Sequence, residues 1–226
     1  MKETIVETNL ENPPMSTLER LELLDVIVNQ TVITAKCDGE LSEVVYDRNG
    51  ESYTLNKWGR KRQDYPALNQ LIEALNKTPV THAKFLAELY AKEEGRPLKL
   101  PQFISLVKGE HQDLSKIHLG IFDLLMLERN PVSADYKWKM EEVSSWLKGC
   151  THVAVVPFIL SRTLQDVKDF WNTYVEGQGY EGLVIQQPNR TYKIKPSLDV
   201  DAVIIGLNKK TSYGKALDLF QQGQIT

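Results

Sequence analysis

The sequence contains few cysteines and histidines and no long apolar run. Its two cysteines, Cys37 and Cys150, do not form a Cys-x-x-Cys pair, which excludes a disulfide framework and a cysteine-rich zinc site. No stretch approaches the roughly 18 to 20 apolar residues of a membrane span, and the N-terminus Met1-Lys2-Glu3-Thr4 lacks the apolar segment of a secretory signal. We therefore expect a soluble cytoplasmic protein that does not use a membrane.

The sequence also has no excess of positively charged residues. The 27 Lys and Arg residues are outnumbered by 30 Asp and Glu, which gives a net charge of −3. A nucleic-acid binder with a uniformly basic surface is excluded, because phosphate contacts need clustered Lys and Arg. Basic residues do gather at Lys57-Trp58-Gly59-Arg60-Lys61-Arg62 and, more loosely, at Lys209, Lys210 and Lys215. Solvated charge is the simpler interpretation for each group, and the favoured one for the second.

The apolar pattern predicts more strands than helices. Arg48-Asn49-Gly50 between two β-rich segments is typical of a hairpin. The predicted strands often follow one another directly, which favours an α+β fold of largely antiparallel sheets over a doubly wound parallel sheet. We predict helices at 16–28, 66–76, 136–147 and 164–175, and strands at 31–36, 44–46, 52–55, 84–90, 117–127, 153–156, 183–186, 191–195 and 202–207.

A short motif, Lys36-Cys37-Asp38-Gly39, is the first sign of chemistry. A Lys-x-Asp-Gly pattern arises by accident in on the order of one chain in twenty of this length, so alone it says little. Its weight comes from an ordered series downstream, in which each member lies in or at the end of a predicted strand. The series is Glu88 in Phe85-Leu86-Ala87-Glu88-Leu89-Tyr90; Phe122-Asp123 in Gly120-Ile121-Phe122-Asp123-Leu124-Leu125; Glu181-Gly182-Leu183-Val184-Ile185; and Tyr192-Lys193-Ile194-Lys195, followed by Asp201-Ala202-Val203-Ile204-Ile205-Gly206.

In this order the segments resemble motifs I, III, IIIa, IV and V of the covalent nucleotidyltransferase superfamily, which contains DNA ligases, RNA ligases and mRNA capping enzymes. The resemblance covers about residues 31–206. It implies an adenylation domain, over residues 1–206, of an ATP-dependent DNA ligase, which forms a lysyl-AMP intermediate. It further implies ATP and Mg²⁺ (or Mn²⁺) as cofactors, nicked or broken nucleic acid as the partner, a monomeric state, and a role in DNA repair or replication.

The residue types suit this chemistry. A lysine amine attacks phosphorus only when unprotonated, and its ordinary pKa of about 10.4 leaves little free base at neutral pH. Strand alternation would place Lys193 and Lys195 on one sheet face, where their charge would disfavour the protonated form of Lys36. Glu88 and Glu181 offer hard oxygen ligands suited to Mg²⁺ that bridges triphosphate oxygens. We expect Lys36 as the nucleophile, Lys193 and Lys195 as phosphate contacts, and Glu88 and Glu181 as metal or ribose contacts.

Other roles come from the resemblance alone. It implies that Phe122 stacks on adenine, that Asp38 and Gly39 shape the loop after the nucleophile, and that Glu88 contacts the ribose and the metal. Taken without its neighbours, Phe122 would be a core residue, and the two glutamates would be exposed charges.

Two positions depart from the family pattern. Many ligases carry an arginine two positions after the glycine of motif I, and here that position is Leu41. Motif Ia usually reads Ser-Arg-x-Gly, whereas Asn56-Lys57-Trp58-Gly59 offers Lys57, with Arg60 just beyond. Lys and Arg are not equivalent for bidentate phosphate binding, so Lys57 and Arg60 are the candidate nucleic-acid contacts, with the arginine's role either moved to Arg60 or weakened.

The segment after motif V leads into an OB-fold in ligases and capping enzymes. Residues 207–226 stand where that barrel would begin and are too few for its about five strands. We expect a truncated or minimal core that self-adenylates slowly, does not seal nicks efficiently alone, and depends on a separate OB-fold or DNA-binding domain.

Alternatives remain open. An RNA ligase, a capping-type guanylyltransferase that uses GTP, and a non-catalytic nucleic-acid-binding relative would share these motifs. The segment 201–206 resembles DNA ligases, and the short spacing between Glu181 and Lys193 resembles RNA ligases. DNA is favoured.

Overall fold

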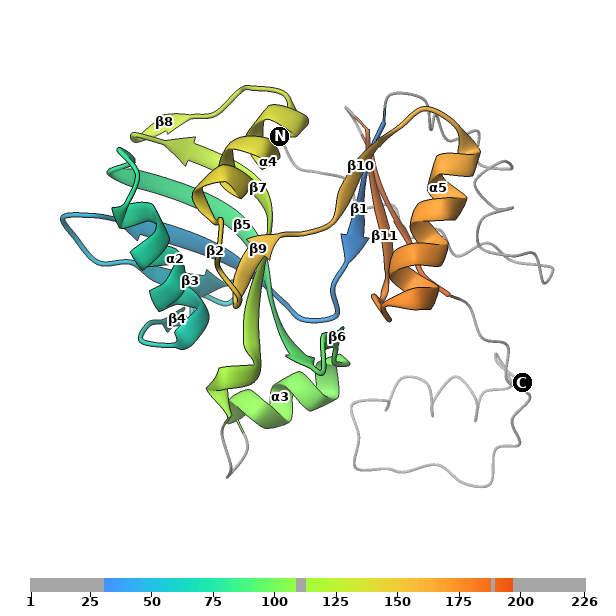
Figure 1. Ribbon diagram of the computed structural model, residues 1–226. Coiled ribbons are helices and arrows are strands. Elements are labelled where there is room, and N and C mark those ends of the chain that lie inside the picture. The colour runs from blue at the N-terminus through green and yellow to red at the C-terminus, as the bar shows by residue number, and fades with distance from the viewer. Residues whose placement is uncertain (1–30, 109–112, 188–189, 197–226) are drawn as a thin grey trace, which may run out of the picture. The chain divides into compact units, whose positions relative to one another are not determined.

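The computed structural model describes residues 31–108, 113–187 and 190–196 (Figure 1). The predicted helix 16–28, the predicted strand 202–207, the second basic group and the segment 207–226 lie outside the described residues.

The larger of two sheets has eight strands. Six of them lie in the order β4-β3-β2-β5-β7-β8, while β6 pairs with β5 and β9 pairs with β7. All these pairs are antiparallel except β7 with β9. The strands are β2 (Glu40–Asp47), β3 (Tyr53–Asn56), β4 (Lys61–Arg62), β5 (His82–Glu93), β6 (Arg96–Pro97), β7 (Ile117–Leu127), β8 (Asn130–Pro131) and β9 (Val153–Val155).

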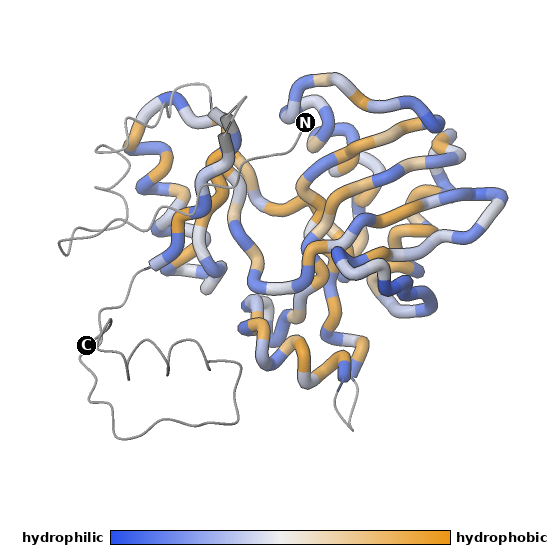
Figure 2. The backbone as a smooth tube through the Cα atoms, turned by 180° about the vertical axis from the view of Figure 1, so that it is seen from behind, coloured by the Kyte–Doolittle hydropathy of each residue, from blue (hydrophilic) through white to orange (hydrophobic). Residues whose placement is uncertain are grey.

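Helices α2 (Pro66–Asn76) and α4 (Tyr136–Trp146) lie against this sheet (Figure 1). Alternate residues of β5, namely Ala83, Phe85, Ala87 and Leu89, are buried, as expected for a strand with one covered face. They pack in one core with the inward side chains of α2, which include Leu68, Leu71 and Leu75. In Figure 2 the strands of this sheet carry orange, apolar stretches and the connecting turns are mostly blue.

The smaller sheet has the order β10-β1-β11-β12 and is antiparallel throughout. Its strands are β1 (Thr31–Lys36), β10 (Phe158–Ser161), β11 (Gly182–Gln187) and β12 (Arg190–Ile194). Helix α5 (Leu164–Trp171) begins with a capping box between Thr163 and Asp166, packs on this sheet, and continues as a π-helix over Asn172–Gly177. Ile33, Leu183 and Ile185 meet Val167, Phe170 and Trp171 in a second core.

The predicted α+β fold of largely antiparallel sheets is confirmed. Strands 31–36 and 117–127 and helix 66–76 have the predicted bounds, and the Asn-Gly hairpin is the β2–β3 pair. The prediction that 164–175 is one α-helix is wrong at its end, because the chain widens into π-helix after Trp171. Strand β10 and helix α3 (Leu100–Lys108) were not predicted; β10 is only four residues long, and α3 has a proline in its first turn.

None of the helices in the described part of the chain is both long and apolar enough to cross a membrane.

The packing of α2 leads to a test of the first core. Leu71 is fully buried, so Leu71→Ala should lower the free energy of unfolding by about 2 to 5 kcal/mol through lost contacts and a cavity. Asn69 lies exposed on the same helix, and Asn69→Ala should change it by less than about 0.5 kcal/mol. Urea unfolding followed by circular dichroism measures both. Equal effects of the two substitutions would contradict the packing described.

Candidate active site

Lys36 and Glu181 are neighbours because of how β1 pairs with β11. Lys36, the last residue of β1, lies opposite Gly182, the first residue of β11. The Glu181 backbone N–H donates to the Lys36 carbonyl at 2.8 Å. This register brings the two side chains together, and the Lys36 ammonium forms an ion pair with the Glu181 carboxylate. Lys36 Nζ also lies 3.3 Å from the Cys37 carbonyl oxygen.

Lys195 reaches the same carboxylate from the other side. It follows the end of β12, which pairs with β11 in a register that sets Ile194 opposite Leu183. Its ammonium forms an ion pair with Oε1 of Glu181, while Lys36 pairs with Oε2. Burial alone would raise the pKa of Glu181, but hydrogen bonds and charge from Lys195 and Lys36 hold it below its ordinary value. One carboxylate therefore lies between two ammonium groups.

Two glycines permit the close approach of the chain around the trio of Lys36, Glu181 and Lys195. A Cβ on Gly182 would lie 2.0 Å from the Ile194 carbonyl oxygen, and one on Gly39 would lie 2.3 Å from the Leu89 carbonyl oxygen. Backbone atoms cannot yield to either Cβ without movement of a strand. Glycine is therefore required in both Asp38-Gly39 and Glu181-Gly182 for steric reasons.

Glu88 lies on β5, beside the loop after β1. Burial raises the pKa of its carboxyl to about 7; Lys36 and a backbone hydrogen bond from Gly39 act against this rise, while Glu181 and Asp38 add to it. A carboxyl that changes charge near neutral pH therefore borders Lys36 and Glu181. Such shifts are concentrated at functional sites.

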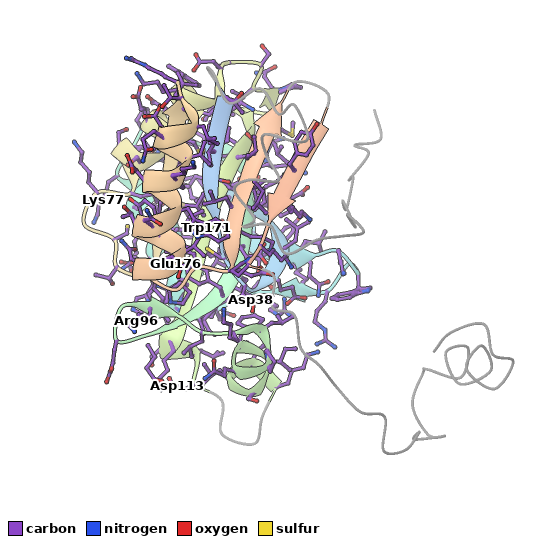
Figure 3. The ribbon with its side chains drawn as sticks, turned by 90° about the vertical axis from the view of Figure 1, so that its right-hand side faces the viewer. Asp38, Lys77, Arg96, Asp113, Trp171 and Glu176 are labelled. Carbon is purple, nitrogen blue, oxygen red and sulfur yellow. The ribbon has the colours of Figure 1, made fainter. Side chains whose placement is uncertain are left out.

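Asp38 fixes the loop after β1 to helix α3. One of its carboxylate oxygens accepts a hydrogen bond from the Leu100 backbone N–H at 3.0 Å. Figure 3 shows Asp38 at the ends of the strands, close to α3. Phe122 is partly buried on β7 and packs against the second core, so its side chain has both a packed and an accessible part.

Other predicted residues lie apart from the trio. Lys193 lies on β12 opposite Val184 and is exposed. It forms no ion pair with any residue in the described ranges, although it is only two residues before Lys195. Lys57 and Arg60 are exposed on the turn between β3 and β4. Leu41 is 44% exposed on β2.

One supporting residue was missed by the sequence reasoning. Gly120 on β7 lies under the loop after β1: a Cβ there would be 2.9 Å from a methyl carbon of Val156 and 3.5 Å from the Cys37 sulfur. The sulfur is buried, which raises the pKa of the Cys37 thiol well above its ordinary value and keeps it unreactive. A glycine in the middle of an apolar strand is the signal that indicates such a close approach.

The pKa of Glu88 gives a prediction for stability. Because the folded pKa of about 7 lies above the ordinary 4.5, the native state holds the Glu88 proton more tightly than the unfolded chain does. This contribution to stability is present below about pH 4.5 and is lost as the pH rises through about 7. The free energy of unfolding of Glu88→Gln, minus that of the unchanged chain, should therefore increase between about pH 4.5 and pH 8, by at most about 3 kcal/mol. Urea unfolding without nucleotide or divalent ions measures the difference, and a difference independent of pH would contradict the assignment.

Comparison with known proteins supports the fold and the family resemblance. The family model described as ATP dependent DNA ligase domain matches residues 18–198. The sequence has no significant match to a curated protein.

Several solved structures share the fold. Mycobacterial DNA ligase D complexed with ATP and MES superposes with a TM-score of 0.55 at 20% identity, over 74% of this chain and 54% of that chain. The protein named Pmar-Lig_Pre. gives 0.53 at 18% identity, over 78% and 42%. A structure from the study of Lig E DNA ligases and DNA binding with a minimal scaffold gives 0.52 at 15% identity, over 77% and 65%.

This chain thus spans less than two thirds of each of these proteins, and at such identities the likeness concerns the fold. The family model covers most of the sequence, and its match includes Lys36, Glu88, Glu181 and Lys195. The chain belongs to the ATP-dependent DNA ligase domain family.

Proposed function

We propose that this chain catalyses the adenylation step of polynucleotide ligation, with Lys36 as the nucleophile. The Lys36 amine attacks the α-phosphorus of ATP and forms a P–N bond. The bond between that phosphorus and the oxygen bridging to the β-phosphate breaks, and pyrophosphate leaves. The observation that carries the proposal is the trio of Lys36, Glu181 and Lys195 at three adjoining strand ends.

The amine must lose a proton before it attacks. Glu181 is a poor acceptor, because its two ion pairs hold its pKa low. Glu88, whose pKa is about 7, can accept this proton at neutral pH only while it is not bound to a metal ion. Glu181 then serves to orient Lys36 toward the nucleotide.

Lys195 is suited to hold phosphate. Its side chain is 52% exposed, so the ammonium can turn from Glu181 toward an incoming triphosphate without leaving a buried site. Lys193, which is exposed two residues before Lys195, would add a second positive charge. Positive charge aimed at the departing pyrophosphate stabilises the transition state more than the ground state.

The carboxylates fit a magnesium ion that arrives with ATP. The residues in the described ranges form no group of three or more His, Cys, Asp or Glu that could hold a metal alone. Mg²⁺ typically uses one or two protein carboxylates together with substrate phosphates and water, and Glu88 and Glu181 supply such a pair. When bound, the ion would neutralise charge on the triphosphate. For Glu181 this requires that at least one of its lysine contacts opens.

The remaining assignments follow the family. Phe122 would stack on adenine with its accessible part, and Asp38 and Gly39 would hold the loop after β1 in place. AMP would then pass from Lys36 to a 5′-phosphate, and a 3′-hydroxyl would displace it. DNA is the favoured polynucleotide because of the family, with RNA ligation as the alternative; Lys57 and Arg60 would contact its backbone.

The covalent product can be tested by mass. With ATP and Mg²⁺, intact mass spectrometry should show an increase equal to one AMP, and Lys36→Ala should show none. Lys84 pairs with Glu43, apart from the trio, and Lys84→Ala should be adenylated like the unchanged chain. An increase equal to GMP with GTP would instead indicate a capping-type enzyme. No increase with either nucleotide would indicate a non-catalytic relative.

A further prediction concerns Lys195. Lys195→Ala should slow the formation of the adduct by about 100-fold or more, because one charge that stabilises the transition state is lost. Rates are read from the mass increase over time, again beside Lys84→Ala. An unchanged rate would remove Lys195 from the proposed site.

A further inference from the structure

The turn between β3 and β4 holds a tryptophan out in solvent. Trp58 is 73% exposed. The turn is built around the buried Asn56, whose Oδ1 accepts the backbone N–H groups of Trp58 at 3.1 Å and Arg60 at 2.9 Å. Gly59 donates its N–H to the Asn56 carbonyl at 2.9 Å and adopts φ +78°, a conformation that favours glycine. The position of Trp58 is therefore fixed by a hydrogen-bonded turn.

Buried charges tie this turn to the neighbouring strands. The Asn56 side-chain amide donates to Glu40, whose other carboxylate oxygen lies 2.7 Å from Nη2 of Arg62. Nη1 of Arg62 is buried and has no hydrogen-bond partner in the described part of the chain. A buried guanidinium donor without an acceptor is costly, so a movement of Arg62 that brought this atom to an acceptor in the neighbouring hollow would be favoured.

A hollow of about 560 Å³ lies beside the turn. Trp58, Arg60 and Arg62 line it, together with Lys108 from α3 and with Glu40. Three cations thus face one carboxylate, which already pairs with Arg62. The volume falls within the range of small-ligand sites, and the charge favours an anion. Lys57 adds a further cation, with its Nζ 4.4 Å from the centre of the Trp58 ring.

An indole ring beside guanidinium groups is suited to bind a nucleic-acid strand. Nucleic-acid strands combine flat bases, which stack on aromatic rings, with phosphates, which pair with Arg and Lys. Within a continuous duplex each base is stacked on both sides, so a protein ring can stack only on a base that is unpaired or splayed out.

We infer that Trp58 stacks on an unpaired base of the polynucleotide while Arg60, Arg62 and Lys108 hold phosphates of the same strand. The substrate class is then a strand junction with unpaired nucleotides, such as a gap, flap or single-stranded end, rather than a fully paired nick. That such a strand is also joined rests on the proposed function, but the binding itself does not require adenylation.

The test compares two duplexes with identical ends, one with a fully paired nick and one with a short gap, by fluorescence anisotropy in the absence of ATP. The unchanged chain should bind the gapped duplex at least about fivefold more tightly, in line with the contribution of one stacked base. Trp58→Ala should lose this preference, and Trp58→Phe, which keeps a ring, should retain most of it. Trp138 is exposed on α4, outside the hollow, and Trp138→Ala should keep the full preference.

A phosphate contact should behave differently from a base contact. Arg60→Gln should weaken binding to both duplexes alike and reduce the slope of log affinity against log salt by about one. Melting temperatures establish that each variant is folded. A preference for the gap that survives Trp58→Ala, or no preference in the unchanged chain, would overturn the inference. Because no ATP is present, these results are independent of whether Lys36 forms an adduct.

Discussion

The site depends on one ionic arrangement, in which Glu181 lies between the ammonium groups of Lys36 and Lys195. The two lysines come from separate strands, and two ammonium groups close together in a partly buried site repel each other. The carboxylate between them offsets that repulsion. A triphosphate would bring negative charge in its place. Under the proposed function, the triphosphate would replace Glu181 as the counter-ion of these two lysines.

Strand pairing supplies the geometry for this exchange. The register of β1 with β11 fixes Lys36 beside Glu181, and that of β11 with β12 fixes Lys195 on the far side. Gly182 keeps the backbone of β12 close, and Gly39 keeps the loop after β1 against β5. A shift of one residue in either register would turn the side chains to the opposite face. The positions of the site residues are thus set by the hydrogen bonds of the sheet and by the two glycines, Gly39 and Gly182.

Much of this could be predicted from the sequence, and the remainder has physical reasons. The strands 31–36 and 117–127 carry a strong apolar pattern, and the ordered motifs predicted Lys36, Glu181 and Lys195 as site residues. Strand alternation predicted Lys193 and Lys195 together, but Lys195 lies beyond the end of β12, where alternation no longer applies. The pairing of Lys36 with a carboxylate, rather than directly with lysines, depends on register across residues 145 positions apart. The Arg62 donor and the hollow beside Trp58 arise from a turn, three strands and helix α3, which no local pattern reveals.

The central claim is that Lys36 carries the AMP. The most direct measurement is proteolytic digestion of the chain after incubation with ATP and Mg²⁺, followed by tandem mass spectrometry of the modified peptide. We expect a single AMP on the peptide that contains Lys36, with fragment ions that assign it to that residue. AMP on Lys193, Lys195 or any other residue, with Lys36 unmodified, would contradict it.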